Sequence, residues 1–159
     1  MLRPMGQVPD DCQKLRSMIL QQKSKAGEII MPVEHRDYPD IAPAGPTYSR
    51  GTKAGNLLFI SGCTARGSEF QGKSLMEQLD ETLKRVVGVV RAEGGSPGDI
   101  AKITCFVTSI ADWQNNPEKQ AELFAKHFEG QYPANSLIEI SALAEPGLDV
   151  EVEAIAVLG

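Results

Sequence analysis

Cysteine and histidine, the residue types that most often do chemistry, are few and scattered in this sequence. The three cysteines are Cys12, Cys63 and Cys105, and none belongs to a CxxC pair. The two histidines, His35 and His127, lie far apart, so these spacings predict no zinc site. A disulfide framework is not expected either, because a chain of 159 residues can build its own hydrophobic core.

Three side chains are candidates for a chemical role, and two of them, Glu151 and Tyr48, are selected by the family resemblance of the motifs and not by residue type or spacing. Cys63 is a nucleophile only if a base or a cation such as Arg66 stabilises its thiolate, and the alternative is an inert thiol. Glu151 either activates a water molecule, which apolar neighbours favour by raising the pKa of its carboxyl, or pairs with a cation between subunits. Tyr48 either hydrogen-bonds a substrate through its hydroxyl or fills the edge of a sheet.

The charge distribution argues against a nucleic-acid or membrane partner. The net charge of -5 comes entirely from residues 46–159, because residues 1–45 hold equal numbers of acidic and basic residues. An acidic surface with no basic run is a poor match to a phosphate backbone. No apolar stretch approaches the roughly 20 residues that cross a bilayer, and the first residues do not resemble a secretory signal. We therefore expect a cytoplasmic protein.

The pattern divides the chain into an N-terminal extension, residues 1–45, and a compact domain, residues 46–159. A helix is expected over about residues 10–25 of the extension, followed by an irregular segment rich in proline. In the domain, the hydrophobic spacing predicts a hairpin at 48–62, a helix from the capping residue Ser74 to Gly94, a strand at 102–110, a helix from Asn116-Pro117 to Gly130, and strands at 135–143 and 149–157.

This order of elements indicates an α+β fold with a mixed β-sheet and two helices on one face. Both strand–helix–strand steps are long enough for crossovers that place the helices on the same side of the sheet. The other face is then left bare, and the final strand presents Glu151, Glu153, Ile155 and Val157 on one side. A surface that is partly apolar and partly charged is typical of a contact between subunits.

Several phrases in this order resemble the RidA family, also called YjgF or reactive-intermediate deaminases. They are Tyr48 and Gly51 followed by Gly55-Asn56-Leu57 and Ser61-Gly62, the stretch EGGSPGDIAKITCFVTSIADW, the phrase Pro133-Ala134-Asn135-Ser136, and the terminal DVEVEAIAV. The match covers roughly residues 46–158. The resemblance implies a chorismate-mutase-like fold, a homotrimer with a cleft at each of three subunit seams, and no cofactor. It also implies hydrolysis of small enamines or imines, or of a relative such as 2-aminomuconate.

The family's site residues carry over unevenly. Tyr48 matches its pocket tyrosine, Gly62 the glycine whose backbone faces the ligand, Glu151 the glutamate associated with the hydrolytic water, and Ser136 follows the anchor position. The anchor is Asn135, where active deaminases have an arginine that grips the substrate carboxylate. Asparagine has no charge and no two-donor fork, so an atypical substrate is expected.

Three questions stay open at the level of sequence. Arg50 or Arg66, which flank the same region, could replace the missing anchor, and Cys63 could lie at the mouth of the cleft. The chain could be a cofactor-independent deaminase or hydrolase, or alternatively a non-catalytic metabolite-binding or chaperone-like trimer. An RNA-cleaving role, sometimes attached to the family's name, fits poorly with the acidic surface.

Overall fold

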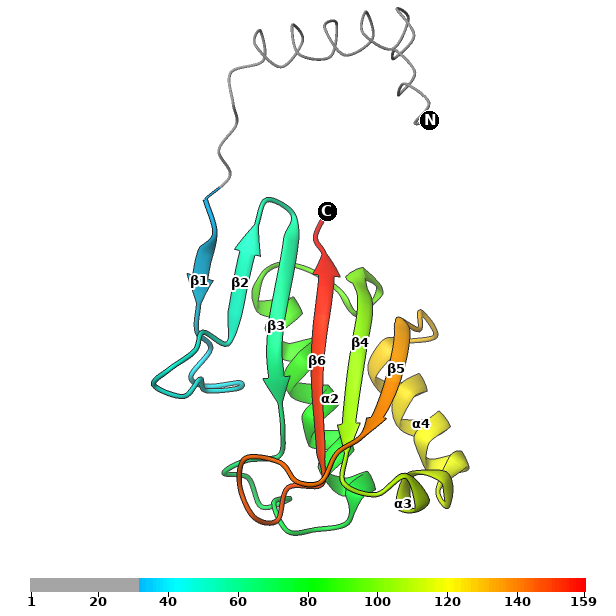
Figure 1. The fold of residues 1–159 in the computed structure, drawn as a ribbon. Helices are drawn as coiled ribbons and strands as arrows, with labels where there is room; N and C mark the ends of the chain where they lie inside the picture. The colour runs from blue at the N-terminus through cyan, green and yellow to red at the C-terminus, as the bar shows by residue number, and fades with distance from the viewer. Residues whose placement is uncertain (1–31) are drawn as a thin grey trace, which may run out of the picture. The chain divides into compact units, whose positions relative to one another are not determined.

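A six-stranded mixed sheet forms the centre of residues 32–159, the part of the chain that our computed structural model describes (Figure 1). Across the sheet the strand order is β1-β2-β3-β6-β4-β5, and only the β4–β5 pair is parallel. The strands are β1 (Glu34–Arg36), β2 (Gly51–Ala54), β3 (Leu57–Cys63), β4 (Ile100–Val107), β5 (Ala134–Glu139) and β6 (Val150–Val157).

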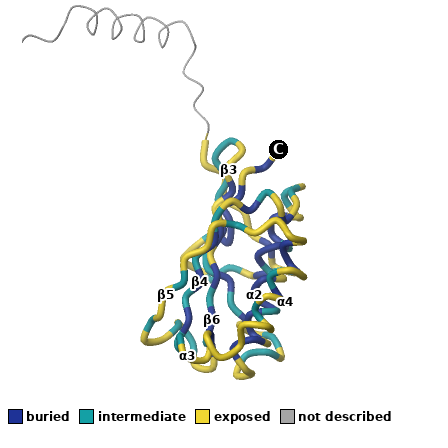
Figure 2. Tube along the Cα trace, turned by 90° about the vertical axis from the view of Figure 1, so that its right-hand side faces the viewer, coloured by how far each residue is buried: buried dark blue, intermediate teal, exposed yellow. Residues whose placement is uncertain are grey.

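The long helices cover one face of this sheet, as predicted (Figures 1 and 2). Helix α2 (Leu75–Ala92) begins at a capping box in which the backbone N–H of Ser74 donates to the Glu77 carboxylate at 3.1 Å. Helix α4 (Pro117–Phe128) has proline in its first turn, where a missing N–H is tolerated. Between α2 and α4 lie a 3-10 turn, η1 (Pro97–Asp99), and the short helix α3 (Ile110–Gln114).

Strand β6 runs through the middle of the sheet, and its side chains point alternately to the face under the helices and to the opposite face. Val150, Val152, Ala154 and Ala156 are buried under the helices. Glu151 and Ile155 point to the opposite face, where Ile155 pairs with Phe59 of β3, and both apolar side chains remain exposed. The alternation expected from the sequence is confirmed, so Glu151 lies on the face that the helices leave uncovered.

Two boundaries differ from the sequence-based expectation. The strand expected over 102–110 ends at Val107, because the Ser109 hydroxyl accepts the Asp112 N–H at 3.1 Å and starts α3. The strand expected over 135–143 ends at Glu139, because it pairs with β4 alone and the last ladder bond runs from Ile140 to Val107.

The compact unit of the described chain begins at Val33, earlier than residue 46. Strand β1 pairs with β2, and Tyr38 and Ala42 are buried in the core. The Tyr38 hydroxyl donates to Glu93 at the end of α2, at 2.8 Å. The helix expected over 10–25 and Cys12 lie outside the described residues.

Candidate functional site

Five of the seven predicted site residues line one cleft beside the C-terminal end of β3. The cleft has a volume of about 360 Å³ and lies between the segment that precedes β2, the loop that follows β3 and the start of β6. The predicted residues that line it are Tyr48, Gly62, Cys63, Arg66 and Glu151. Arg50, Arg85 and Glu145 line it as well, and of these the sequence pointed only to Arg50.

The closest approach in the cleft is between Glu151 and Gly62. The β3–β6 register shifts between Ile60 and Cys63, and this irregularity places Gly62 against the Glu151 side chain. A Cβ atom added to Gly62 would lie 2.0 Å from Oε1 of Glu151, so only glycine leaves room for the carboxylate. Burial raises the pKa of Glu151, the nearby Arg50 opposes this shift, and Glu153 adds to it. A raised pKa makes a half-buried carboxyl a better proton acceptor and therefore a better candidate for general-base chemistry.

Arg50 is 5% exposed and lies beneath the cleft. A guanidinium has five N–H donors, and five oxygen atoms lie around this one. Its acceptors are the carbonyl oxygens of Ala42 (2.9 Å), Pro43 (2.9 Å), Ser61 (3.2 Å) and Gly62, and the hydroxyl of Tyr48 (3.1 Å). Because all of these donors bind protein atoms, Arg50 has no pair of free N–H groups with which to bind a ligand carboxylate. The predicted role of Arg50 as a replacement anchor is therefore not supported by this geometry.

Tyr48 stands at the rim of the cleft with 43% of its surface exposed. The Arg50 guanidinium carbon lies 5.3 Å from the centre of its ring, within the range of a cation–π contact. A Cβ atom on Gly45 would lie 2.8 Å from the same ring, so the Tyr48 ring is held between Gly45 and Arg50. The ring is therefore held in place by the protein while a large part of the side chain stays exposed.

The remaining two predicted residues of the cleft do not supply a nucleophile. Cys63 is 1% exposed, and burial raises the pKa of its thiol to about 11, so the inert alternative is the better description. Arg66 lies at the mouth and forms an ion pair with Glu145 at 2.7 Å. Both partners are well exposed, so this pair contributes little to stability and could open for a ligand.

Asn135 and Ser136 lie elsewhere in the same chain. Both are exposed on β5, which is separated from β3 by β6 and β4. Asn135 lines an open hollow of about 480 Å³ with aromatic side chains of the α3–α4 region and Tyr132. The Ser136 hydroxyl accepts a hydrogen bond from Lys102 at 2.9 Å. Within one chain Asn135 therefore lies apart from Tyr48, Gly62 and Glu151, and the expectation that these residues meet where three copies associate stays a prediction.

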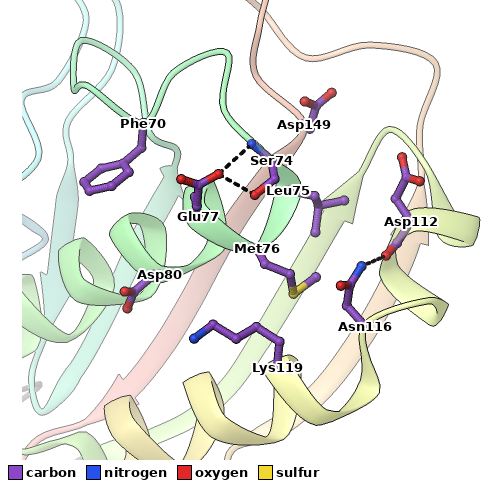
Figure 3. A pocket seen from close by; sticks show the side chains of 10 residues that line it. All are labelled: Phe70, Ser74, Leu75, Met76, Glu77, Asp80, Asp112, Asn116, Lys119 and Asp149. Carbon is purple, nitrogen blue, oxygen red and sulfur yellow. Dashed lines mark hydrogen bonds between the residues drawn. The ribbon is translucent and has the colours of Figure 1, made fainter.

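A larger pocket of about 620 Å³ lies at the N-terminal end of α2 (Figure 3). Four carboxylates line it, and three of them have structural partners. Glu77 caps α2, Asp80 binds Lys126 at 2.7 Å and His127 at 2.6 Å, and Asp149 accepts from Thr108 at 2.7 Å. This pocket therefore offers less free chemistry than the smaller cleft.

Residues 32–159 contain neither a metal-binding cluster nor a membrane-spanning helix. Within this range no group of three or more His, Cys, Asp or Glu side chains could hold a metal ion. No helix in this part of the chain is long and apolar enough to cross a membrane.

The fold and cleft define a small α+β protein with one helical layer and a polar pocket at one end of its sheet. The sequence profile of the family described as Endoribonuclease L-PSP matches residues 40–158. The RutC family protein PH0854 of Pyrococcus horikoshii is 32% identical over 117 residues, which cover 72% of this chain and 88% of that protein. Reactive Intermediate Deaminase A, chloroplastic, of Arabidopsis thaliana is 32% identical over 122 residues, covering 74% of this chain and 62% of that protein.

The structural comparison agrees with the sequence comparison. The crystal structure of Escherichia coli TdcF with bound serine has a TM-score of 0.69 and 28% sequence identity, covering 79% of this chain and 99% of that one. The chain belongs to the RidA (YjgF) family, as its motifs predicted.

Proposed function

We propose that this chain is a deaminase of the RidA family that hydrolyses a small imine or enamine in the cleft around Glu151. The observation that carries the proposal is the Glu151 carboxyl, which lies over the Gly62 backbone with a raised pKa and faces a pocket lined by Tyr48. This arrangement provides a base that can hold a water molecule and a hydroxyl that can orient a substrate. The deaminase name of the Arabidopsis relative supports the same reaction class.

The proposed reaction converts an imine and water into a carbonyl compound and ammonia. Glu151 takes a proton from the water as its oxygen forms a bond to the imine carbon, and the C=N electron pair moves to nitrogen. The protonated Glu151 then returns that proton to the nitrogen. Glu151 then takes the proton of the new hydroxyl group as the C=O bond forms and passes it to the amine nitrogen as the C–N bond breaks, so that ammonia leaves and the carboxylate is regenerated. The carboxyl accepts and donates protons in alternate steps, which a pKa near the working pH favours.

A second subunit would complete the cleft in this proposal. Asn135 and Ser136 are exposed on β5, and the uncovered sheet face carries exposed apolar side chains such as Phe59 and Ile155. A homotrimer that buries this face could bring β5 of one copy to the cleft of the next. Asn135 would then contact the substrate with neutral hydrogen bonds, which favours a head group other than the usual carboxylated imine.

The test is ammonia release from freshly generated 2-iminopropanoate and from uncharged imines, with Glu151→Gln as the matched variant. We expect the wild-type protein to accelerate release from at least one imine, and Glu151→Gln, which keeps the size of the side chain but cannot act as a base, to lose the acceleration. Thermal stabilisation by serine or a 2-keto acid without any turnover would support the alternative, a metabolite-binding trimer that is not an enzyme.

A further inference from the structure

The hydrogen bonds of Arg50 determine what Tyr48 can offer to a ligand. One of the five donors of Arg50 reaches the phenol oxygen of Tyr48 at 3.1 Å, and the other four reach backbone carbonyls. Among residues 32–159 no carboxylate forms an ion pair with Arg50. A buried positive charge whose hydrogen-bond partners are all neutral therefore lies directly behind the Tyr48 hydroxyl, and it is near enough to Glu151 to oppose the rise in the pKa of that carboxyl.

The Tyr48 oxygen accepts from Arg50, so its own proton is left to point away from the guanidinium. Within the described residues this proton has no protein acceptor, and Tyr48 is a partly exposed residue that lines the cleft. A cationic donor polarises the O–H group to which it binds, and this strengthens the next hydrogen bond in the chain. The Arg50 N–H and the Tyr48 O–H are thus two consecutive hydrogen-bond donors, and the second of them ends in the cleft.

We propose that Arg50 is a positioning residue that makes Tyr48 a hydrogen-bond donor, so that the cleft selects ligands with an acceptor, a carboxylate or carbonyl oxygen, at this point. A ligand ammonium group would instead meet an O–H donor with a buried cation behind it. The inference rests on the cleft of the proposed function and adds the chemical class of the group that Tyr48 binds. It also gives Arg50 a role other than the direct anchor that the sequence suggested.

The experiment measures binding of pyruvate, the product expected from 2-iminopropanoate, and of ethylammonium, by NMR titration. We expect pyruvate to bind and ethylammonium not to bind. Tyr48→Phe should weaken pyruvate binding by about tenfold or more, the effect of one charge-assisted hydrogen bond. Arg91→Gln serves as the control, since Arg91 is exposed, pairs with Glu129 and lies outside the cleft.

A double-mutant cycle separates positioning from a purely structural role. Arg50→Gln should weaken pyruvate binding in the wild-type background and have no further effect in the Tyr48→Phe background. An equal loss of pyruvate affinity in both backgrounds would overturn the proposal. Unchanged pyruvate affinity in Tyr48→Phe would also overturn it, and this variant leaves the buried arginine intact. Wild-type protein that binds no pyruvate, or that binds ethylammonium equally well, would also overturn it. Binding is read without turnover, so pyruvate binding without ammonia release would contradict the proposed function alone.

Discussion

The Glu151 carboxylate occupies the space where any residue other than glycine at position 62 would place its Cβ atom. The nearest atoms to that added carbon would be Oε1, Cδ and Cγ of Glu151, at 2.0, 2.4 and 2.7 Å. All three belong to one flexible side chain, so a larger residue at position 62 would displace Glu151 rather than the backbone. The position of the proposed catalytic carboxyl therefore depends on the absence of a side chain on the neighbouring strand.

Gly62→Ala should abolish most of the activity with little loss of stability. The added methyl group displaces Glu151 from the cleft, and we expect at least a hundredfold fall in the rate of ammonia release. The melting temperature should fall by only about a few degrees. Gly98→Ala is the matched control, because its Cβ would also meet the end of a flexible side chain, Gln131 at 2.4 Å, away from the cleft. A Gly62→Ala protein with full activity would show that the Glu151 position does not matter.

Glu151→Gln should raise stability at neutral pH. Burial raises the pKa of Glu151 above its ordinary value of 4.5, so the folded state holds this proton more tightly than the unfolded state. Stability contributed by the protonated form is present below pH 4.5 and is lost as pH rises through the raised pKa. Glutamine avoids this loss. Because the side chain is half exposed, we expect a melting temperature about 1–3 °C higher at pH 7, with the difference closing below pH 4. A difference that stays constant with pH would contradict the raised pKa.

Asn135→Arg should improve the use of carboxylated imines. Two charge-assisted hydrogen bonds contribute about 1.5–3 kcal/mol each, so an arginine that reaches the substrate carboxylate should lower KM by about a hundredfold. Asn135→Lys is the informative control, because it adds the charge without the planar fork and should give a smaller gain. The measurement is the rate of ammonia release from 2-iminopropanoate over a range of concentrations. A wild-type protein that already matches the arginine variant would refute a substrate preference set by Asn135.

Cys63 and Cys105 should be inert in the folded protein. Burial raises the pKa of these thiols to about 11 and about 12, and neither is more than 1% exposed. In a Cys12→Ser variant, which removes the thiol outside the described residues, Ellman's reagent at pH 8 should label fewer than about one in ten molecules until the protein is unfolded. Rapid labelling of Cys63 in the native state would reopen the nucleophile hypothesis.

The hydrophobic pattern was sufficient to predict most of the fold. The capping box at Ser74 and Glu77, and the two-residue alternation of β6, are local signals that tertiary contacts reinforce. The ends of strands were harder to predict, since they depend on partner strands. Strand β5 ends where its partner β4 ends. The sequence after β5 nevertheless continues with Ile140, Ser141, Ala142 and Leu143, a pattern typical of a strand.

The candidate site could be predicted only in part, for a related reason. The cleft residues Gly62 and Cys63 lie on β3, and Glu151 lies on the adjacent β6, so their meeting follows from strand pairing. Asn135 lies on a strand two places further along the sheet, and its relation to the cleft depends on how copies of the chain associate. The hydrogen bonds of Arg50 were not visible in the sequence, because its acceptors are backbone carbonyls, which carry no residue-type signal.

The uncovered face of the sheet leads to a prediction about assembly. Phe59 and Ile155 are Cα partners on adjacent strands, are 40% and 36% exposed, and lie on the face opposite the helices. If this face joins the subunits of a homotrimer, light scattering should give about three times the chain mass of 17.2 kDa. Ile155→Asp places a charge in the contact and should yield monomers, because an unpaired buried charge is strongly unfavourable. Val33→Asp is the control, since Val33 is also an exposed apolar residue but precedes β1.

The Ile155→Asp monomers should also lose ammonia release, because Asn135 would no longer reach a neighbouring cleft. Monomeric wild-type protein with full activity would exclude a cleft shared between subunits.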